Sequence, residues 1–167
     1  MFLVGAATAL LCGNIELAIR NRFREWSCFC ILLSELYRNN RYQRYTLPEE
    51  FLRLLTMLPT ETEIFQATRN FDERLSEMTG SFWDAWEDYA EQVEKILHFS
   101  AGLKLNFLEL GAVLPKTEEE GISHALCGLI EQAGEEKKQY GYSMKKRRTT
   151  KLSCVVLVGA MTMLLLW

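Results

Sequence analysis

The chain has 167 residues, a length that suits a single domain. Apolar residues make up 49% of it and the formal net charge is −3, so nothing in the overall charge suggests nucleic acid or a strongly acidic ligand as a partner. The five cysteines include no CxxC pair and the two histidines are His98 and His124, which is poor material for a metal site or a disulfide framework. The densest apolar runs lie at the two ends, and the middle is rich in charge.

The first apolar run, residues 1–19, is expected to form a transmembrane helix. No basic residue precedes this run, whereas Arg20, Arg22 and Arg24 follow it. A cleaved signal peptide has the opposite order, with its basic region first. The sequence therefore predicts an uncleaved anchor whose N-terminus lies outside.

Small residues recur in this run at every fourth position, as Gly5, Ala9 and Gly13. Small residues at this spacing share one helix face and let a second helix approach closely. Either this face packs against another membrane helix, or the spacing follows from a run rich in glycine and alanine. The carboxylate of Glu16 either reaches the interface or serves a function inside the membrane.

The middle of the chain shows helical periodicity and no convincing alternating strand. We expect the first helix to continue to about Arg38 and a short second helix to begin around Pro48 and to end near Leu58. The apolar stripe of the first helix comprises Phe23, Trp26, Phe29, Cys30, Leu33, Leu36 and Tyr37.

Capping residues indicate where the third and fourth helices begin. Thr60 with Glu63 resembles a capping box for the third helix, which Gly80 ends. Ser81 with Asp84 is expected to cap the fourth helix. The side chains expected to face inward are Ile64, Phe65, Phe71, Leu75 and Met78 in the third helix, and Phe82, Trp86, Tyr89 and Val93 in the fourth.

A fifth helix is expected over about residues 102–114, where the following proline breaks it. Thr117 with Glu120 is expected to cap the sixth helix. This last helix is expected to run unbroken toward the C-terminal apolar run, although Gly134 and Gly141 weaken it.

The second apolar run, residues 152–167, contains no charge and is expected to form a second transmembrane helix. As a helix it spans about 24 Å, modestly short of the hydrocarbon core of about 30 Å. The basic residues that precede it are Lys145, Lys146, Arg147, Arg148 and Lys151. Basic residues therefore flank both runs on their inner sides, which predicts a cytoplasmic domain over residues 20–151 with both termini outside.

The predicted fold class is thus all-α, a bundle of about six helices with transmembrane helices at its N- and C-terminal ends. No catalytic, cofactor or metal site is predicted, because the histidines lack an evident partner and no nucleotide-binding or metalloprotease motif occurs. We expect neither enzymatic activity, nor a small-molecule substrate, nor nucleic-acid binding. The carboxylates with helical surface spacing are expected to be solvated, namely Asp84, Glu87, Asp88, Glu91, Glu118, Glu119 and Glu120.

Three stretches carry a resemblance to a known family: YTLPEEF at 45–51, FWDAWEDYAEQV at 82–93 and LELGAVLPKTEEEGI at 108–122. With the basic helix that enters a short C-terminal run, they make the chain similar to stage III sporulation protein AB of endospore-forming bacteria over nearly its whole length. The residues that the resemblance marks as structural are Trp86, Leu110 and Gly111. The chain departs from the family pattern at Pro115, where a glycine is expected.

The resemblance implies a non-catalytic scaffold in a secretion-like channel complex that links mother cell and forespore and is required for forespore development. It also implies similarity to the inner-membrane platform protein F of type II secretion. The expected partners are other stage III sporulation A-operon proteins, including a cytoplasmic secretion-type ATPase and membrane channel components, together with membrane lipids. The central domain would face the mother-cell cytoplasm.

Two alternatives belong to other classes. The chain could be a two-pass adaptor or signalling protein that uses its basic juxtamembrane residues on anionic lipid. A membrane enzyme would need a catalytic constellation that the sequence does not display.

Overall fold

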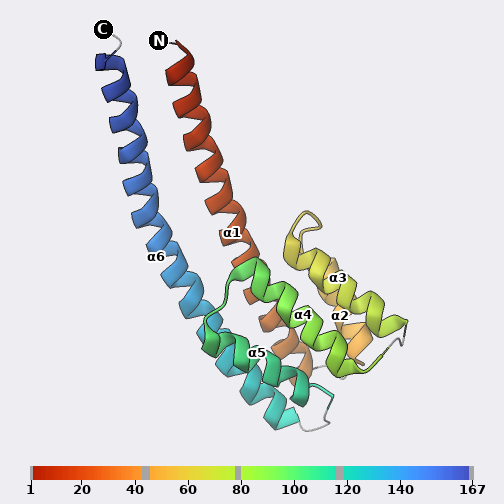
Figure 1. Ribbon diagram of the computed structural model, residues 1–167. Helices are drawn as coiled ribbons and strands as arrows, with labels where there is room; N and C mark the ends of the chain where they lie inside the picture. The colour runs from red at the N-terminus through yellow and green to blue at the C-terminus, as the bar shows by residue number, and fades with distance from the viewer. Residues whose placement is uncertain (1, 43–45, 78–79, 116–118, 166–167) are drawn as a thin grey trace. The chain divides into compact units, whose positions relative to one another are not determined.

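The computed structural model describes residues 2–42, 46–77, 80–115 and 119–165, with side chains omitted for most of residues 2–12 and 151–165 (Figure 1). These residues form six helices and no strand, which confirms the all-α prediction. The helices are α1 (Phe2–Tyr42), α2 (Leu47–Met57), α3 (Glu63–Ser76), α4 (Phe82–Leu97), α5 (Ala101–Val113) and α6 (Glu119–Leu165). No helix in the described part of the chain is long and apolar enough to cross a membrane.

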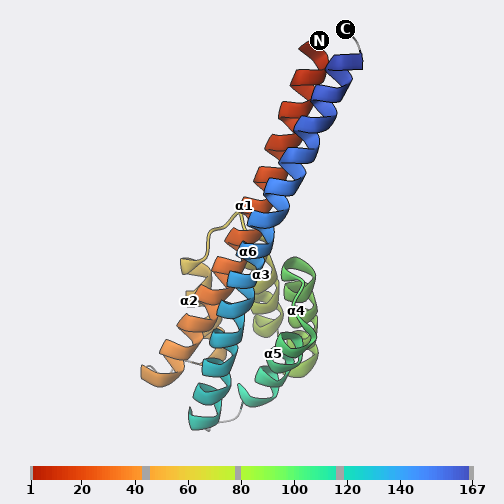
Figure 2. The same ribbon diagram turned by 90° about the vertical axis from the view of Figure 1, so that its left-hand side faces the viewer.

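The chain divides into two compact units. The first comprises residues 1–23 and 138–167, and the second, called the bundle unit below, comprises residues 24–137. In the first unit the beginning of α1 and the end of α6 lie side by side and finish at the same end (Figures 1 and 2). The two helices approach closely there, since a Cβ atom added to Gly141 would lie 3.6 Å from Cε2 of Phe23.

Contacts within its first turn fix the start of α2. Pro48 lies in that turn, as the sequence predicted, and Thr46 precedes the helix. One carboxylate oxygen of Glu49 accepts hydrogen bonds from the backbone N–H of Thr46 at 3.0 Å and from its hydroxyl at 2.8 Å. The preceding helix, α1, ends at Tyr42, one turn beyond the predicted end at Arg38.

The predicted cap of α3 was wrong, because Thr62 and not Thr60 is the N-cap residue. The Thr62 hydroxyl accepts a hydrogen bond from the backbone N–H of Phe65 at 3.3 Å and donates one to the carbonyl of Pro59 at 2.7 Å. A turn closed by the Thr62 N–H and the Pro59 carbonyl precedes the helix. Thr60 belongs to this turn, so its side chain is too early in the chain to cap the helix.

The starts of the later helices agree with the sequence where the structure describes them. Ser81 caps α4 by accepting a hydrogen bond from the N–H of Asp84 at 3.2 Å. Gly80 just before it has φ of +102°, a conformation that favours glycine. Helix α6 continues through Gly134 and Gly141 as predicted, whereas the predicted cap at Thr117 lies outside the described residues.

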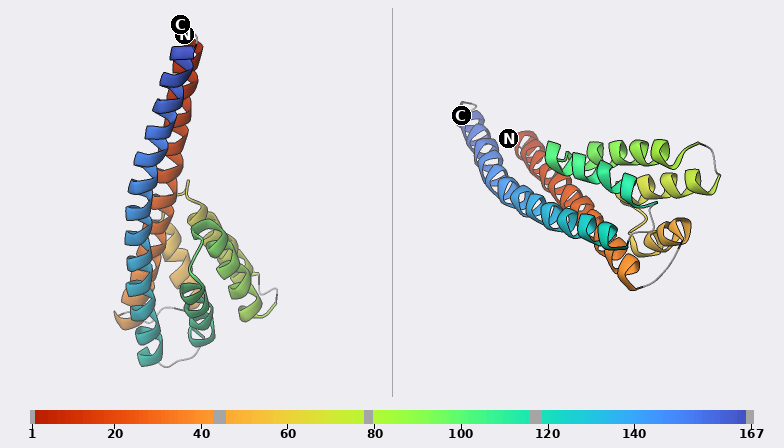
Figure 3. Two further views of the ribbon diagram at one scale, coloured as in Figure 1. Left: turned by 60° about the vertical axis from the view of Figure 1, so that its left-hand side comes forward. Right: turned by 90° about the horizontal axis from the view of Figure 1, so that it is seen from below.

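In the bundle unit α2 packs on α3, α3 on α4 and α4 on α5 (Figure 3). Aromatic side chains fill the space between them, and the Phe71 ring lies 4.8 Å from the Phe51 ring and 4.9 Å from the Tyr89 ring. Such ring pairs stabilise a core beyond the area that they bury. Rings from α2, α3 and α4 therefore share one core.

Most side chains expected to face inward do so. Those that are buried are Trp26, Phe29, Leu33, Leu36, Ile64, Phe71, Trp86, Tyr89 and Val93. Cys30, Tyr37, Phe65, Leu75 and Phe82 are half-buried. Phe23 is exposed, contrary to the prediction, and Met78 lies outside the described residues. Phe23 belongs to the first unit, so it lies beyond the part of α1 that contributes to the bundle core.

Replacing Thr62 by alanine removes the oxygen that caps α3. We expect the free energy of unfolding to fall by about 1 kcal/mol, as is typical of a lost threonine cap. The matched control is Thr60→Ala, an exposed site where the change should stay within about 0.5 kcal/mol. Urea denaturation followed by tryptophan fluorescence measures both, and equal losses at the two positions would contradict the cap assignment.

Candidate functional site

The residues that the family resemblance marks come together in the core of the bundle unit. Trp86 of α4 and Leu110 of α5 are fully buried, and Gly111 is buried beside them. The Trp86 Nε1–H donates a hydrogen bond to the carbonyl of Phe107 at 3.1 Å, which satisfies the polar atom of the indole ring. Trp86 and Gly111 therefore pack against each other in this core, and the structural role that the resemblance gives to the three residues stays a prediction.

Gly111 is required by the position of the Trp86 ring. A Cβ atom at Gly111 would lie 2.0 Å from Cδ1 and 2.3 Å from Nε1 of that ring, far inside van der Waals contact. The ring cannot move away easily, because it is enclosed and its N–H is bonded to α5 itself. Only glycine lets the backbone of α5 approach the ring this closely.

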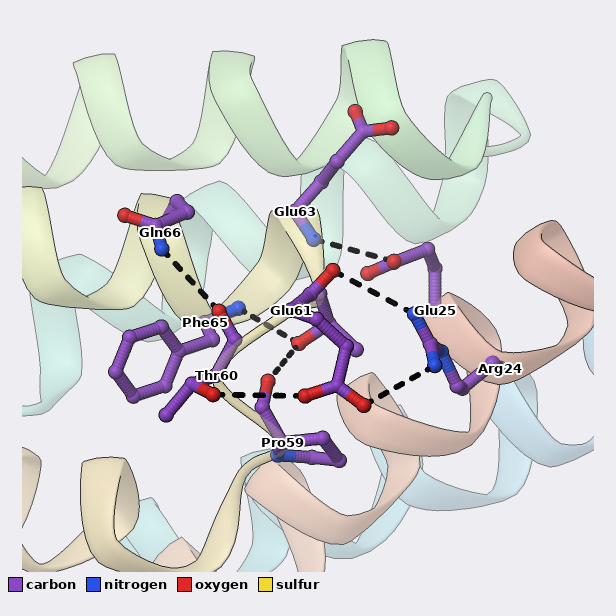
Figure 4. Close-up of polar contacts among 9 residues, drawn as sticks. Arg24, Glu25, Pro59, Thr60, Glu61, Glu63, Phe65 and Gln66 are labelled. Atoms are coloured by element: carbon purple, nitrogen blue, oxygen red, sulfur yellow. Dashed lines mark hydrogen bonds and ion pairs between the residues drawn. The ribbon is translucent and has the colours of Figure 1, made fainter.

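A buried glutamate of α1 fastens the start of α3. Glu25 is 6% exposed, and one of its carboxylate oxygens accepts a hydrogen bond from the backbone N–H of Glu63 at 3.1 Å (Figure 4). Its other carboxylate oxygen accepts one from the backbone N–H of Ile64 at 3.0 Å. These N–H groups have no partner inside their own helix, and a negative charge is favourable at a helix N-terminus. The contact joins residues 38 and 39 positions apart in the chain.

An exposed ion pair lies next to this contact. The Arg24 guanidinium lies 3.3 Å from a carboxylate oxygen of Glu61 and donates a second hydrogen bond to the Glu61 carbonyl at 3.5 Å (Figure 4). Among the other predicted juxtamembrane residues, Arg20 lies 3.5 Å from Glu16 and Arg22 is half-buried. Exposed pairs of this kind contribute little to stability, so their main effect is to direct Arg20 and Arg24 toward carboxylates of the same chain.

A second glutamate, on α6, fastens the start of α5. The carboxylate of Glu136 accepts hydrogen bonds from the backbone N–H of Ser100, at 3.2 Å, and from its hydroxyl. Ser100 is the N-cap of α5 and accepts a bond from the N–H of Leu103 at 3.2 Å. Each long helix thus supplies one carboxylate to the start of a short helix. Sequence analysis missed both, because neither glutamate belongs to a local motif.

The basic residues near the C-terminal run are only partly described. Lys145 and Lys146 are exposed and form no ion pair with any described residue, whereas the side chains of Arg147, Arg148 and Lys151 lie outside the description. The hydroxyls of Thr149 and Thr150 donate to the carbonyls of Lys145 and Lys146, at 3.0 Å and 3.1 Å. The hydroxyl groups of this part of α6 are therefore satisfied within the helix.

The small-residue stripe of α1 is also only partly described. Gly5 and Ala9 lie within α1, but the surroundings of their side chains lie outside the description. A Cβ atom added to Gly13 would meet no described atom within 4 Å. The packing role of Gly5, Ala9 and Gly13 stays a prediction.

Two neighbouring glutamates in α2 have opposite environments. Glu50 is 7% exposed, one of its oxygens has no hydrogen-bond partner in the described structure, and burial raises the pKa of its carboxyl to about 7. The hydrogen bonds from Thr46 hold the pKa of Glu49 below its usual range. Glu50 was not singled out from the sequence, where nothing separates it from Glu49.

The surface carboxylates of α4 are exposed as predicted, and several are paired. Asp84, Glu87, Asp88 and Glu91 are exposed. The guanidinium of Arg74 contacts Asp88, and Nζ of Lys95 lies 3.5 Å from Glu91. Among the residues that the structure describes, no group of three or more histidine, cysteine or acidic side chains could hold a metal ion.

These features define an all-helical protein of two long and four short helices in the described part of the chain, in which carboxylates of α1 and α6 bind the starts of α3 and α5. The family model for stage III sporulation protein AB matches residues 1–167, the whole chain, and the chain belongs to that family. The resemblance seen in the sequence is thereby confirmed, and membership implies a role in stage III of sporulation. No curated protein and no solved structure matches the chain.

Replacing Gly111 by alanine forces a methyl group against the Trp86 ring. We expect the free energy of unfolding to fall by about 1–3 kcal/mol, the usual cost of overpacking a dense core. The matched control is Gly128→Ala in α6, where a Cβ atom meets nothing within 4 Å. That change should stabilise the helix by up to about 1 kcal/mol. Urea denaturation measures both variants.

A double variant tests the cause of the Gly111 effect. Trp86→Phe removes the five-membered ring whose atoms face Gly111. Adding Gly111→Ala to Trp86→Phe should therefore cost less than adding it to the wild type. Strictly additive losses would show that the Trp86 ring is not what excludes the methyl group.

The raised pKa of Glu50 predicts that the free energy of unfolding falls as the pH rises. Its folded-state pKa of about 7 lies above the ordinary value of 4.5, so the folded protein holds this proton more tightly than the unfolded chain. The contribution of this bound proton to the free energy of unfolding is therefore lost between about pH 4.5 and pH 7. Glu50→Gln removes the titration and should raise the free energy of unfolding by about 3 kcal/mol at pH 8, with little change at pH 4.

The control for this titration is Glu49→Gln. The pKa of Glu49 is depressed in the folded state, so its contribution is present at neutral pH and is lost on acidification. Urea denaturation of both variants at pH 4, 6 and 8 should show changes of opposite sign at neutral pH. A Glu50→Gln variant that is less stable than the wild type at pH 8 would refute the buried-carboxyl assignment.

Proposed function

We propose that the chain is a non-catalytic membrane scaffold of a secretion-like channel complex that links mother cell and forespore during stage III of sporulation. The observation that carries this proposal is the match of the family model to residues 1–167. The features below support it from the sequence and from the contacts of the described residues.

The sequence of the two ends supports membrane anchoring. Residues 1–19 and 152–167 are apolar runs with basic residues on their inner sides, which favours a cytoplasmic middle and outward termini. The beginning of α1 and the end of α6 pack side by side and finish at the same end of their unit (Figures 1 and 2). The proposed two-pass anchoring rests on the sequence of these two ends and on their antiparallel arrangement.

The carboxylate contacts support a bundle unit in which short helices are joined directly to the long ones. Helix α1 holds the start of α3 through Glu25, and α6 holds the start of α5 through Glu136. A force on α3 or α5 would therefore reach a long helix directly, without a flexible linker between them. Rigid-body movement of packed helices is a common way to transmit such a force.

The expected source of that force is a partner with its own energy supply. The proposed partners are a cytoplasmic secretion-type ATPase and the membrane channel components encoded with it. By analogy with the inner-membrane platform protein F of type II secretion, the bundle unit would face the ATPase on the mother-cell side.

One observation favours the alternative adaptor function. Lys145 and Lys146 are exposed and unpaired within the described structure, as residues that contact anionic lipid would be. A free-standing adaptor would bind anionic liposomes in a strongly salt-dependent manner, and its loss would not impair channel assembly.

Deleting the gene in its native sporulating host tests the proposed function. We expect small, collapsed forespores after engulfment and a large drop in heat-resistant spores, because the forespore would lose its connection to the mother cell. Imaging and spore counts measure these outcomes, and the intact gene should restore both. Normal spores in a host without a second copy of the gene would contradict the proposal.

Variants of the restoring gene test the transmission step. A chain with Glu25→Gln and Glu136→Gln loses two carboxylates that fasten short helices and should restore spores poorly. The matched control carries Glu87→Gln and Asp84→Gln at exposed positions and should restore them fully. Immunoblots of membrane fractions establish that both variants are present at equal levels.

A further inference from the structure

Helix α2 buries three side chains, and one of them ends in a carboxyl group. The three are Glu50, Phe51 and Leu54. Phe51 belongs to the aromatic core, where its ring lies 4.8 Å from the Phe71 ring of α3 and 6.3 Å from the Tyr89 ring of α4. The packing of α2 therefore removes the carboxyl of Glu50 from water together with two apolar side chains.

Glu50 is buried without a cation to balance its charge. It is 7% exposed, one of its carboxyl oxygens has no hydrogen-bond partner in the described structure, and it forms no ion pair with any described residue. A buried carboxylate without such partners costs much more free energy than the neutral carboxyl does. Helix α2 is therefore held most firmly while Glu50 carries its proton.

The titratable groups of the neighbouring helices do not supply the missing cation. Those of α1 to α4 that the structure describes as buried or half-buried in the bundle unit are Glu25, Cys28, Cys30, Glu35, Tyr37, Arg53, Asp72, Arg74, Tyr89 and Glu94. The cations of this described set are Arg53 and Arg74, and neither forms an ion pair with Glu50. Burial therefore acts on the carboxyl of Glu50 and raises its pKa to about 7.

The start of α2 is held differently from the starts of α3 and α5. Glu25 of α1 binds the start of α3, and Glu136 of α6 binds the start of α5. The start of α2 is instead closed by its own residues, because Glu49 accepts both hydrogen bonds from Thr46. Release of α2 therefore leaves both links to the long helices intact.

We propose that α2 is a proton-controlled latch, which packs on α3 while Glu50 is neutral and detaches more often once Glu50 is ionised. Detachment returns the carboxylate to water and uncovers Phe71, whose ring packs against Phe51 in the closed form. The latch thus converts the loss of one proton into an exposed apolar surface on α3. This local opening is distinct from global unfolding, and it does not depend on the proposed channel function.

Amide hydrogen exchange of the purified full chain in detergent micelles, followed by mass spectrometry, tests the latch. Peptides over Leu47–Met57 report the opening constant of α2 after correction for intrinsic exchange rates. If opening returns the pKa of Glu50 from about 7 to 4.5, this constant should rise about 40-fold between pH 5 and pH 7. At pH 7 it should exceed the constant of α4, from peptides over Phe82–Leu97, at least tenfold, because α4 stays packed when α2 opens.

Two variants decide whether Glu50 is the group that controls the opening. Glu50→Gln keeps the shape of the side chain and removes its proton equilibrium, so the rise of the α2 opening constant should shrink to less than threefold. Asp72→Asn is the matched control, since Asp72 is a half-buried acid of α3 whose pKa is also raised by burial. This control should keep most of the 40-fold rise.

Three outcomes would overturn the proposal. The first is a wild-type rise below threefold, and the second is a full rise that persists in Glu50→Gln. The third is equal opening constants for α2 and α4 at pH 7, which would mean that Glu50 acts through global unfolding alone. The first and third outcomes are measured on the wild type, so the test stays decisive even if Glu50→Gln fails to fold.

Discussion

The approach of the Trp86 ring to the backbone of α5 at Gly111 sets the geometry on which the rest of the bundle unit depends. The same ring lies 5.6 Å from Phe71 of α3, and its N–H is bonded to the carbonyl of Phe107. The Phe107 ring in turn lies 5.3 Å from Phe29 of α1. Helices α3 and α5 therefore meet at this indole ring of α4, and Phe107 connects the ring to α1. A single methyl group at Gly111 would disturb all of them because a dense core cannot yield locally.

Three buried or half-buried glutamates show how the surroundings decide the cost of burying a carboxylate. Both oxygens of Glu25 accept hydrogen bonds from N–H groups that no helix carbonyl could satisfy. The same contact therefore satisfies the buried carboxylate and the first N–H groups of α3. Glu136 does the same for the start of α5 at a half-buried position. Glu50 has an oxygen without a partner in the described structure. Burial therefore favours the neutral carboxyl and raises its pKa to about 7, which avoids a buried charge at lower pH.

Local contacts could be predicted from the sequence and distant ones could not. The cap of α4 was predicted because Ser81 and Asp84 lie within one turn. The cap of α3 was not, since Thr60 with Glu63 fits the local capping-box pattern, whereas the actual helix start also depends on Glu25, 38 residues earlier. The family resemblance marked Gly111, but the reason for a glycine there follows only from the ring that folding brings against it.

Helices α5 and α6 are joined in two different ways along their length. The bonds from Ser100 to Glu136 and from Asn106 to Gln132 hold the first half of α5 to α6. Beyond Asn106 the two helices stay in contact, since a Cβ atom at Gly121 would lie 3.8 Å from Cγ1 of Val113. Leu110 of α5 and Leu129 of α6 are buried there. Hydrogen bonds therefore hold the first half of α5 to α6, whereas apolar packing holds the second half, because burial of apolar side chains needs no specific partner atom.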